Sequence, residues 1–232
     1  MKRAPGTVSL AASPGHALGE MAKRALASVD RADRKGPARV AVSHAAAGGP
    51  VVERMMRAFG GLFPGAEVRA FRVEGERHPM PAAEARAIVD DADLIFFGGG
   101  DPVEGAHILV GAGADAWVRE ARARGAACLG VSAGAMMLCA WWAAWPDDPE
   151  PDARHDGGEL VSCTRVVPDL VVDCHAEGDG WCELELVHGL LRDRLDADAP
   201  LPRLLGLPTG TGVIVAGDGS IEAVGGSPFR LR

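Results

Sequence analysis

Short runs of apolar residues alternate along the chain with longer segments in which apolar positions recur at helical spacing. The short runs are typical of buried parallel strands, and the longer segments of amphipathic helices. The pattern predicts strands at residues 8–10, 39–43, 67–73, 92–97, 126–131 and 170–174, and helices at residues 17–29, 51–59, 82–89, 133–142 and 182–195. This alternation indicates a parallel sheet with helices on both faces.

The last part of the chain has a different pattern. Residues 213–216 and 221–224 are apolar runs on either side of Asp218-Gly219, a dipeptide that favours a type I′ turn, so they predict a closing β-hairpin. No linker separates the predicted strands and helices into domains. Residues 145–158 are typical of a surface loop rather than of a domain boundary. We therefore expect a single three-layer α/β/α domain over residues 1–232, with a mostly parallel sheet and a C-terminal hairpin.

The charge balance excludes several classes of partner. The chain has 24 Lys and Arg against 32 Asp and Glu, a net charge of −8, which is the opposite of a nucleic-acid binder's basic surface. No apolar stretch approaches the roughly 18 residues of a membrane span, and the N-terminus has no signal-peptide pattern. We expect a cytoplasmic protein with no membrane or nucleic-acid partner.

Two patterns that imitate cofactor or metal sites fail on their spacing. Residues 108–116 resemble a dinucleotide fingerprint, but no acid occurs at the end of the next strand, so a helix interruption is the simpler interpretation. The acidic segment 147–156 has no H-E-x-x-H or EF-hand spacing. The five cysteines contain no pair with a two-residue gap and indicate free thiols. We expect no cofactor and no metal.

One serine stands where a strand is predicted to turn into a helix. Gly130-Val131-Ser132-Ala133-Gly134 matches a nucleophile elbow, a strained turn that exposes a serine Oγ. The Ala133 N–H at the start of the helix would then be a donor to the oxyanion of a tetrahedral intermediate. The alternative is that Ser132 only caps the helix, a common role for serine.

A serine nucleophile needs a general base, and His175 is the best placed of the seven histidines. It follows the strand at 170–174, at the carboxyl edge where open α/β sheets place their chemistry and where Ser132 would also lie. Its neighbour Cys174 is a rival nucleophile, but adjacent strand side chains point to opposite faces, so we expect a buried thiol. The residues alone leave a structural role for His175 open.

Three segments, in this order, resemble the peptidase E and cyanophycinase family of serine peptidases. They are Gly98-Gly99-Gly100-Asp101 after an apolar strand, Gly130-Val131-Ser132-Ala133-Gly134-Ala135, and Asp173-Cys174-His175. The resemblance runs from residue 92 to residue 215. It implies a class I glutamine-amidotransferase-like fold, with Ser132 as nucleophile and His175 as base. It also implies that the turn at Gly99 and Gly100 supplies a second oxyanion donor.

Two positions depart from that family. Peptidase E has asparagine where this chain has Asp101, whose carboxylate favours an ammonium, so we expect Asp101 to bind the free amino group of the substrate. Thr209 stands where the family has a glutamate, so the usual third triad member is missing. Asp147, which matches a second acidic position of peptidase E, is the first candidate to orient His175. Asp173, two residues away on the same strand, is the second.

We therefore expect a serine exopeptidase, a dipeptidase or a carboxypeptidase-like enzyme, that hydrolyses short peptides. The family often forms dimers or larger assemblies, and the cluster of Trp141, Trp142 and Trp145 suits a subunit interface, so we expect a homo-oligomer. One alternative is a non-catalytic member that binds a small molecule. Others are a cyanophycinase-like or other amidase, although residues 176–181 lack the arginine-bearing stretch of cyanophycinases, or a glutaminase, which would use cysteine at the elbow.

Overall fold

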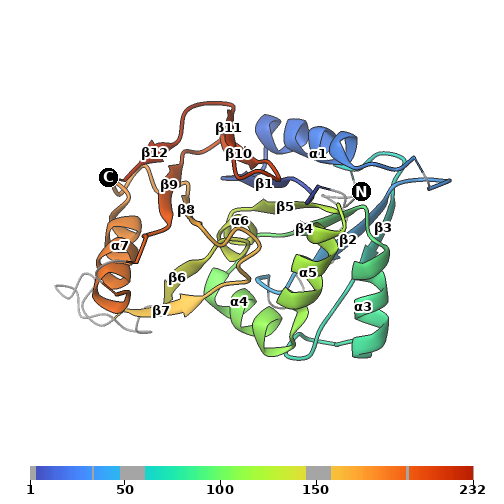
Figure 1. The fold of residues 1–232 in the computed structure, drawn as a ribbon, viewed down its shortest axis with the longest axis horizontal. Coiled ribbons are helices and arrows are strands. Elements are labelled where there is room, and N and C mark those ends of the chain that lie inside the picture. The colour runs from blue at the N-terminus through green and yellow to red at the C-terminus, as the bar shows by residue number, and fades with distance from the viewer. Residues whose placement is uncertain (1–3, 33, 48–60, 145–157, 197–198, 232) are drawn as a thin grey trace.

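The computed structural model describes residues 4–32, 34–47, 61–144, 158–196 and 199–231. Its main sheet has seven strands in the order β11-β10-β1-β5-β4-β2-β3 (Figure 1). These are β1 (Val8–Ala11), β2 (Arg39–Ser43), β3 (Glu67–Ala70), β4 (Leu94–Phe97), β5 (Ala127–Val131), β10 (Gly212–Val215) and β11 (Ile221–Val224). The strands β1, β5, β4, β2 and β3 run parallel, and the hairpin of β10 and β11 adds two antiparallel strands. The expected parallel sheet and closing hairpin are both confirmed.

Helices cover both faces of this sheet. They are α1 (His16–Ser28) on one face, and α3 (Ala82–Asp91), α4 (Pro102–Gly111) and α5 (Ala114–Ala123) on the other (Figure 1). Strand β4 shows why the sheet needs both layers. Leu94 and Phe96 pack into the core formed with α1, while Ile95 and Phe97 pack into the core formed with α3, α4 and α5. A strand buried on both faces reads as a continuous apolar run, which is how the sequence showed it.

The rest of the chain builds two smaller sheets beside the main one (Figure 1). Strand β8 (Leu170–Cys174) is parallel to β9 (Arg203–Leu207), which pairs on its other side with β12 (Phe229–Arg230). Strands β6 (Trp141–Ala144) and β7 (Glu159–Ser162) form an antiparallel pair. Helix α7 (Cys182–Arg194) packs against both of these sheets.

Two expectations about this part of the chain were wrong. The helix expected over 133–142 is only α6 (Ala133–Met137), and the two tryptophans that follow begin strand β6 instead. The Ala140 N–H donates to Leu170 O and the Ala140 carbonyl accepts from Cys163 N, so contacts with distant segments end the helix. The strand at 170–174 exists, but it belongs to the three-stranded sheet rather than to the sheet that carries Ser132.

Other expectations are confirmed or lie outside the described residues. Helix α4 ends and α5 begins within the imitation of a dinucleotide fingerprint, so that segment is a helix interruption. The expected helix over 51–59 and most of the expected loop 145–158 fall outside the described residues. Within the described part of the chain, no helix is long and apolar enough to cross a membrane.

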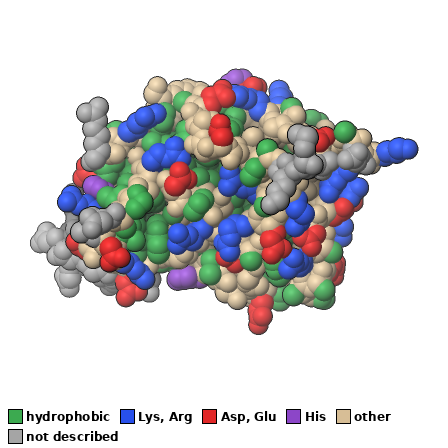
Figure 2. All heavy atoms as spheres, in the orientation of Figure 1, with side chains coloured by type: hydrophobic (Ala, Val, Ile, Leu, Met, Phe, Trp, Pro, Cys, Tyr) green, Lys and Arg blue, Asp and Glu red, His purple; other side chains and the backbone are tan. Residues whose placement is uncertain are grey.

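Charged side chains of both signs are interspersed over α3 and α5 on the face seen in Figure 2. Arg86 bonds Asp90 and Glu120, and Arg124 bonds the same Asp90. All four side chains are well exposed, so this is a solvated outer surface whose pairs contribute little to stability.

Candidate active site

Ser132 lies on a strained turn between β5 and α6. Its backbone angles are φ 54° and ψ −125°, a left-handed conformation that costs a non-glycine residue free energy. The Ser132 side chain makes no capping hydrogen bond to α6. The structure therefore does not support the helix-cap alternative, and the strain is that of an elbow that holds its serine out from the backbone.

The two elbow glycines are required by close backbone approach. A Cβ on Gly130 would lie 2.4 Å from the Gly134 carbonyl oxygen, and one on Gly134 would lie 2.2 Å from the Phe97 carbonyl oxygen. Helix α6 is thereby pressed onto the ends of β4 and β5. This contact fixes the position of Ser132 relative to the glycine turn that follows β4.

His175 reaches Ser132 from the other sheet. Ser132 Oγ and His175 Nε2 are 2.9 Å apart, within hydrogen-bond distance. His175 directly follows β8, also has a positive φ, 51°, and its N–H donates to Leu207 O at 2.9 Å. The sequence analysis expected these two residues to lie close together, and they do. It expected them at the edge of one sheet, whereas they follow strands of two different sheets. Ser132 is half-buried and His175 is exposed, so a substrate can reach both.

Backbone N–H groups lie beside the serine. Ala133 is the first residue of α6, so its N–H has no partner within the helix. The turn after β4 passes close by, because a Cβ added to Gly99 would lie 3.3 Å from Ser132 Cβ and 3.7 Å from its Oγ. Gly100 has φ 144° and leaves no room for a side chain, since a Cβ there would lie 1.8 Å from Ala46 O. The structure thus places Ala133 and Gly99 beside Ser132, and Gly100 in the wall of the same cleft.

Asp101 lies at the mouth of the site and caps α4. Its Oδ1 accepts from the N–H groups of Val103 at 2.8 Å and Glu104 at 3.0 Å. The side chain is exposed and lines the same cleft as Ser132. The Asp101 carboxylate therefore has a structural role of its own beside the expected contact with substrate.

Among the described residues, no acid is hydrogen-bonded to the imidazole of His175, whose Nε2 lies against Ser132 Oγ. Asp147 lies outside the described residues. Asp173 lines the cleft, but the structure records no hydrogen bond between its carboxylate and His175. Sequence reasoning missed Glu177. The Thr209 N–H donates to its Oε1 at 3.1 Å, and hydrogen bonds from Thr209 lower the pKa of Glu177, with a smaller lowering from His175 nearby.

The cleft has a volume of about 520 Å³ and is walled by α4, α6, β6, the end of β8 and the start of α7. Four carboxylates line it, those of Asp101, Asp173, Asp179 and Glu183, and no Lys or Arg does so among the described residues. Burial, then the charge of Glu183 and that of Asp179, raises the pKa of Asp173 from 3.8 to about 7. This clustering could not be predicted from residue spacing, because Asp179 comes from a loop and Glu183 from helix α7.

The cysteines offer no competing chemistry. All five are free thiols, as expected. Cys174 is buried, and burial raises the pKa of its thiol, so it stays protonated and is a poor nucleophile. Its Sγ lies 3.7 Å from the Ser132 carbonyl oxygen, to which it donates, and so braces the elbow. Among the described residues, no group of three His, Cys, Asp or Glu side chains could hold a metal ion.

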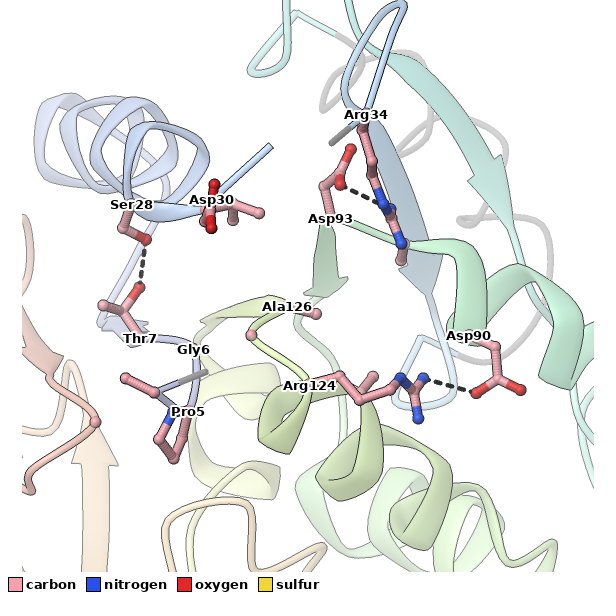
Figure 3. Close-up of a pocket in the computed structure, with 16 residues that line it drawn as sticks. Pro5, Gly6, Thr7, Ser28, Asp30, Arg34, Asp90, Asp93, Arg124 and Ala126 are labelled. Carbon is pink, nitrogen blue, oxygen red and sulfur yellow. Dashed lines mark hydrogen bonds and ion pairs between the residues drawn. The ribbon is translucent and has the colours of Figure 1, made fainter. Parts of the chain in front are cut away.

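A second cavity, of about 620 Å³, lies at the opposite, amino edge of the main sheet (Figure 3). Four of its charged side chains form two ion pairs: Arg34 bonds Asp93 at 2.8 Å, and Arg124 bonds Asp90 at 2.8 Å. It holds none of the candidate catalytic residues. The described candidate residues Ser132 and His175 lie instead in the cleft at the carboxyl edge.

The strained turn at Ser132 lies at the carboxyl edge of a parallel sheet, and His175 is within hydrogen-bond distance of its Oγ. These features place the molecule in the class of α/β proteins with a serine elbow. The sequence model of peptidase family S51 matches residues 43–180, more than half of the chain. The chain belongs to peptidase family S51, a family of serine-type peptidases.

Solved structures share the fold over the whole chain. A peptidase from an acI-B1 Actinobacterium superimposes with a TM-score of 0.71 at 20% identity, covering 100% of this chain and 96% of that one. A protein assigned as a peptidase E from Listeria monocytogenes EGD-e gives a TM-score of 0.60 at 14% identity, covering 99% and 100%. A search of curated proteins gives no match. At these identities the structures show the fold, and the family match shows the peptidase class.

Proposed function

We propose that this chain is a serine exopeptidase that hydrolyses short peptides, with Ser132 as nucleophile and His175 as general base. The observation that supports this most is the 2.9 Å contact between Ser132 Oγ and His175 Nε2 on a strained elbow at the cleft. Ser132 Oγ attacks the scissile carbonyl carbon while His175 Nε2 takes its proton. The N–H of Ala133 and those of Gly99 and Gly100 stabilise the oxyanion. His175 then returns the proton to the leaving amine, and water releases the acyl group.

The size and rim of the cleft favour short substrates. A volume of about 520 Å³ is in the range of sites for small ligands rather than of grooves for long chains. In the proposed complex, Asp101 at the rim receives the free amino group of the peptide, through the carboxylate oxygen that does not cap α4. This contact would limit cleavage to a peptide end.

The proposal is tested by incubating a mixture of short peptides, with free or blocked ends, with wild type and Ser132→Ala, and identifying the products by mass spectrometry. We expect wild type to cleave peptides and Ser132→Ala to lower kcat about 10⁴- to 10⁶-fold. A fluorophosphonate, whose phosphorus bonds to the serine Oγ as fluoride leaves, should label wild type and the control Ser162→Ala but not Ser132→Ala. Absence of both cleavage and label would favour the non-catalytic alternative.

We further propose Glu177 as a positioning residue for His175. Thr209 holds the Glu177 carboxylate in the electrostatic range of the imidazole, where it would stabilise the imidazolium formed during attack. Glu177→Gln keeps the shape and removes the charge, so we expect kcat to fall about 10- to 100-fold, less than for a buried triad acid. The acid limb of the pH profile should also move to lower pH. An unchanged rate and profile would assign the orienting role elsewhere.

A further inference from the structure

The turn that carries His175 is held at its start by the end of β9. This turn, residues 175–181, connects β8 to α7. The His175 N–H donates to Leu207 O at 2.9 Å, and the Thr209 N–H donates to Glu177 Oε1 at 3.1 Å. Two nearby positions of one segment thus hold both the proposed base and the carboxylate near it.

Trp181 holds the other end of the same turn. It is only 6% exposed and lies over Gly206 of β9, where an added Cβ would be 2.5 Å from the indole ring atoms Cδ2 and Cε3. Phe229 of β12 pairs with Gly206, and its ring stacks on the indole with centroids 5.7 Å apart and 6° between the planes. Aromatic pairs favour such offset stacking. This contact of Trp181 with Gly206 and Phe229 is termed the indole anchor.

The backbone of the turn is strained and depends on contacts that hold it. His175 and Trp181 have φ 51° and 69°, left-handed conformations that persist in bulky residues only where the surroundings impose them. The Trp181 N–H donates to Ala176 O at 3.2 Å and to Asp179 Oδ1 at 2.9 Å, which closes the turn on itself. A displaced indole would therefore move the residue that directly follows His175.

We propose that Trp181 is a positioning residue for catalysis, because its anchored indole holds the turn so that the Glu177 carboxylate stays near His175. Trp181 is not among the described residues that line the cleft, so it acts through the turn rather than on the substrate. The inference rests on the proposed function, in which His175 is the general base. Loosening the anchor should reproduce, in weaker form, the loss of the Glu177 charge.

Two variants loosen the indole anchor from different sides. Phe229→Ala removes the stacked ring, which is 38% exposed, so its loss costs little core packing. Gly206→Ala places a methyl group against the indole and displaces it. Circular dichroism would confirm that both variants are folded.

The rate of fluorophosphonate labelling measures how well His175 activates Ser132, and it needs no peptide. We expect Phe229→Ala and Gly206→Ala each to slow labelling about 5- to 20-fold at pH 7, since a small displacement of a catalytic group is costly. The acid limb of the labelling rate should move to lower pH, in the direction expected for Glu177→Gln. A merely structural role would leave that limb in place.

Two controls separate positioning from stability. Phe229→Tyr keeps the stacked ring and should label at the wild-type rate. Leu201→Ala removes a side chain of matching exposure, 37%, that lies outside β9 and β12, and it should change neither rate nor profile. Wild-type rates and profiles in folded Phe229→Ala and Gly206→Ala would overturn the proposal.

A double-mutant cycle tests the route through Glu177. In the Glu177→Gln background, Phe229→Ala should slow labelling by less than about twofold, because the carboxylate that it displaces is already gone. The full effect of Phe229→Ala in that background would overturn the proposal, since the indole would then act by another route.

Peptide turnover keeps this inference distinct from the proposed function. In both variants of the anchor, kcat should fall while KM stays within about twofold, because Trp181 does not line the described cleft. Cleavage with kcat unchanged in both variants would overturn the positioning role and leave the exopeptidase. Slower labelling in both variants, with no cleavage of any peptide by wild type, would overturn the exopeptidase and leave the positioning role.

Discussion

The amino edge and the carboxyl edge of the main sheet each hold a cavity, of about 620 Å³ and about 520 Å³ (Figure 3 shows the first). At the amino edge, the buried Asp93 carboxylate meets Arg31 and Arg34 and accepts the N–H of Arg39. At the carboxyl edge, the buried Asp173 carboxylate has an oxygen with no partner among the described residues. The cavities are similar in size, so it is the pairing of charge that distinguishes the amino edge from the carboxyl edge, where the candidate catalytic residues lie.

Among substitutions that test this comparison, we expect the largest change in the free energy of unfolding at the amino edge. Asp93→Ala leaves two guanidinium groups and a backbone N–H without their acceptor, so we expect it to lower the free energy of unfolding by about 3 kcal/mol. Urea unfolding would measure this. Peptidase activity of the folded fraction should stay at the wild-type level, because Asp93 is remote from Ser132.

A matched control uses the exposed pair of the same cavity. Arg124→Ala removes only a solvated ion pair with Asp90 and should cost at most about 0.5 kcal/mol. If Asp93→Ala cost no more than this control, the amino edge would not depend on its buried pairing, and the contrast between the edges would fail.

A smaller effect of opposite sign is expected at the carboxyl edge. The pKa of Asp173 is raised from 3.8 to about 7 in the folded chain, mainly by burial. The folded state therefore keeps the proton at a pH where the unfolded state has lost it. The contribution of this proton to the free energy of unfolding is complete below about pH 4 and is lost as the pH rises through about 7. At 1.36 kcal/mol per pKa unit, half of this shift is about 2 kcal/mol. Asp173→Asn removes the ionisation, so we expect it to stabilise the protein by about 2 kcal/mol at pH 8.

The measurement is thermal unfolding of wild type and Asp173→Asn at pH 5 and pH 8. The variant should exceed wild type at pH 8, and the difference should shrink at pH 5, where wild-type Asp173 is protonated when folded. A variant that is less stable at pH 8 would show that the ionised carboxylate has a stabilising partner. The buried carboxylates of both edges, Asp93 and Asp173, would then be stabilised by partners, and the contrast between the edges would fail.

The sequence predicted the main sheet because its strands are buried on both faces and therefore read as unbroken apolar runs. Residues 94–97, Leu-Ile-Phe-Phe, are such a run. It did not predict β6, since Trp141 and Trp142 continue a plausible helical period and only pairing with Ser162 and Val161 of β7 makes them a strand. Nor did it show that β8 leaves the main sheet, because pairing of β8 with β9 is decided by segments about 30 residues apart.

The residues of the candidate site were also only partly predictable from the sequence. Ser132 and His175 could be found because each stands directly after a predicted strand, and their contact agrees with that expectation. Asp179 and Glu183 could not, because a loop and a helix start bring them to the cleft and no spacing rule encodes that meeting. Glu177 could not either, because its hydrogen bond with Thr209 joins positions 32 residues apart. Asp173 was weighed as an orienting acid, whereas the structure shows it as a buried carboxylate with an oxygen left unpaired.

The division of Ser132 and His175 between two sheets has a consequence for synthesis. A ribosome releases the chain from its N-terminus, so the elbow at Ser132 emerges 43 residues before His175. The His175 N–H donates to the Leu207 carbonyl, and β8 pairs in parallel with β9, so the imidazole is not positioned until residue 207 has emerged. The contact between Ser132 and His175 therefore forms late in translation, after the strands β1 to β5 and the elbow have already emerged.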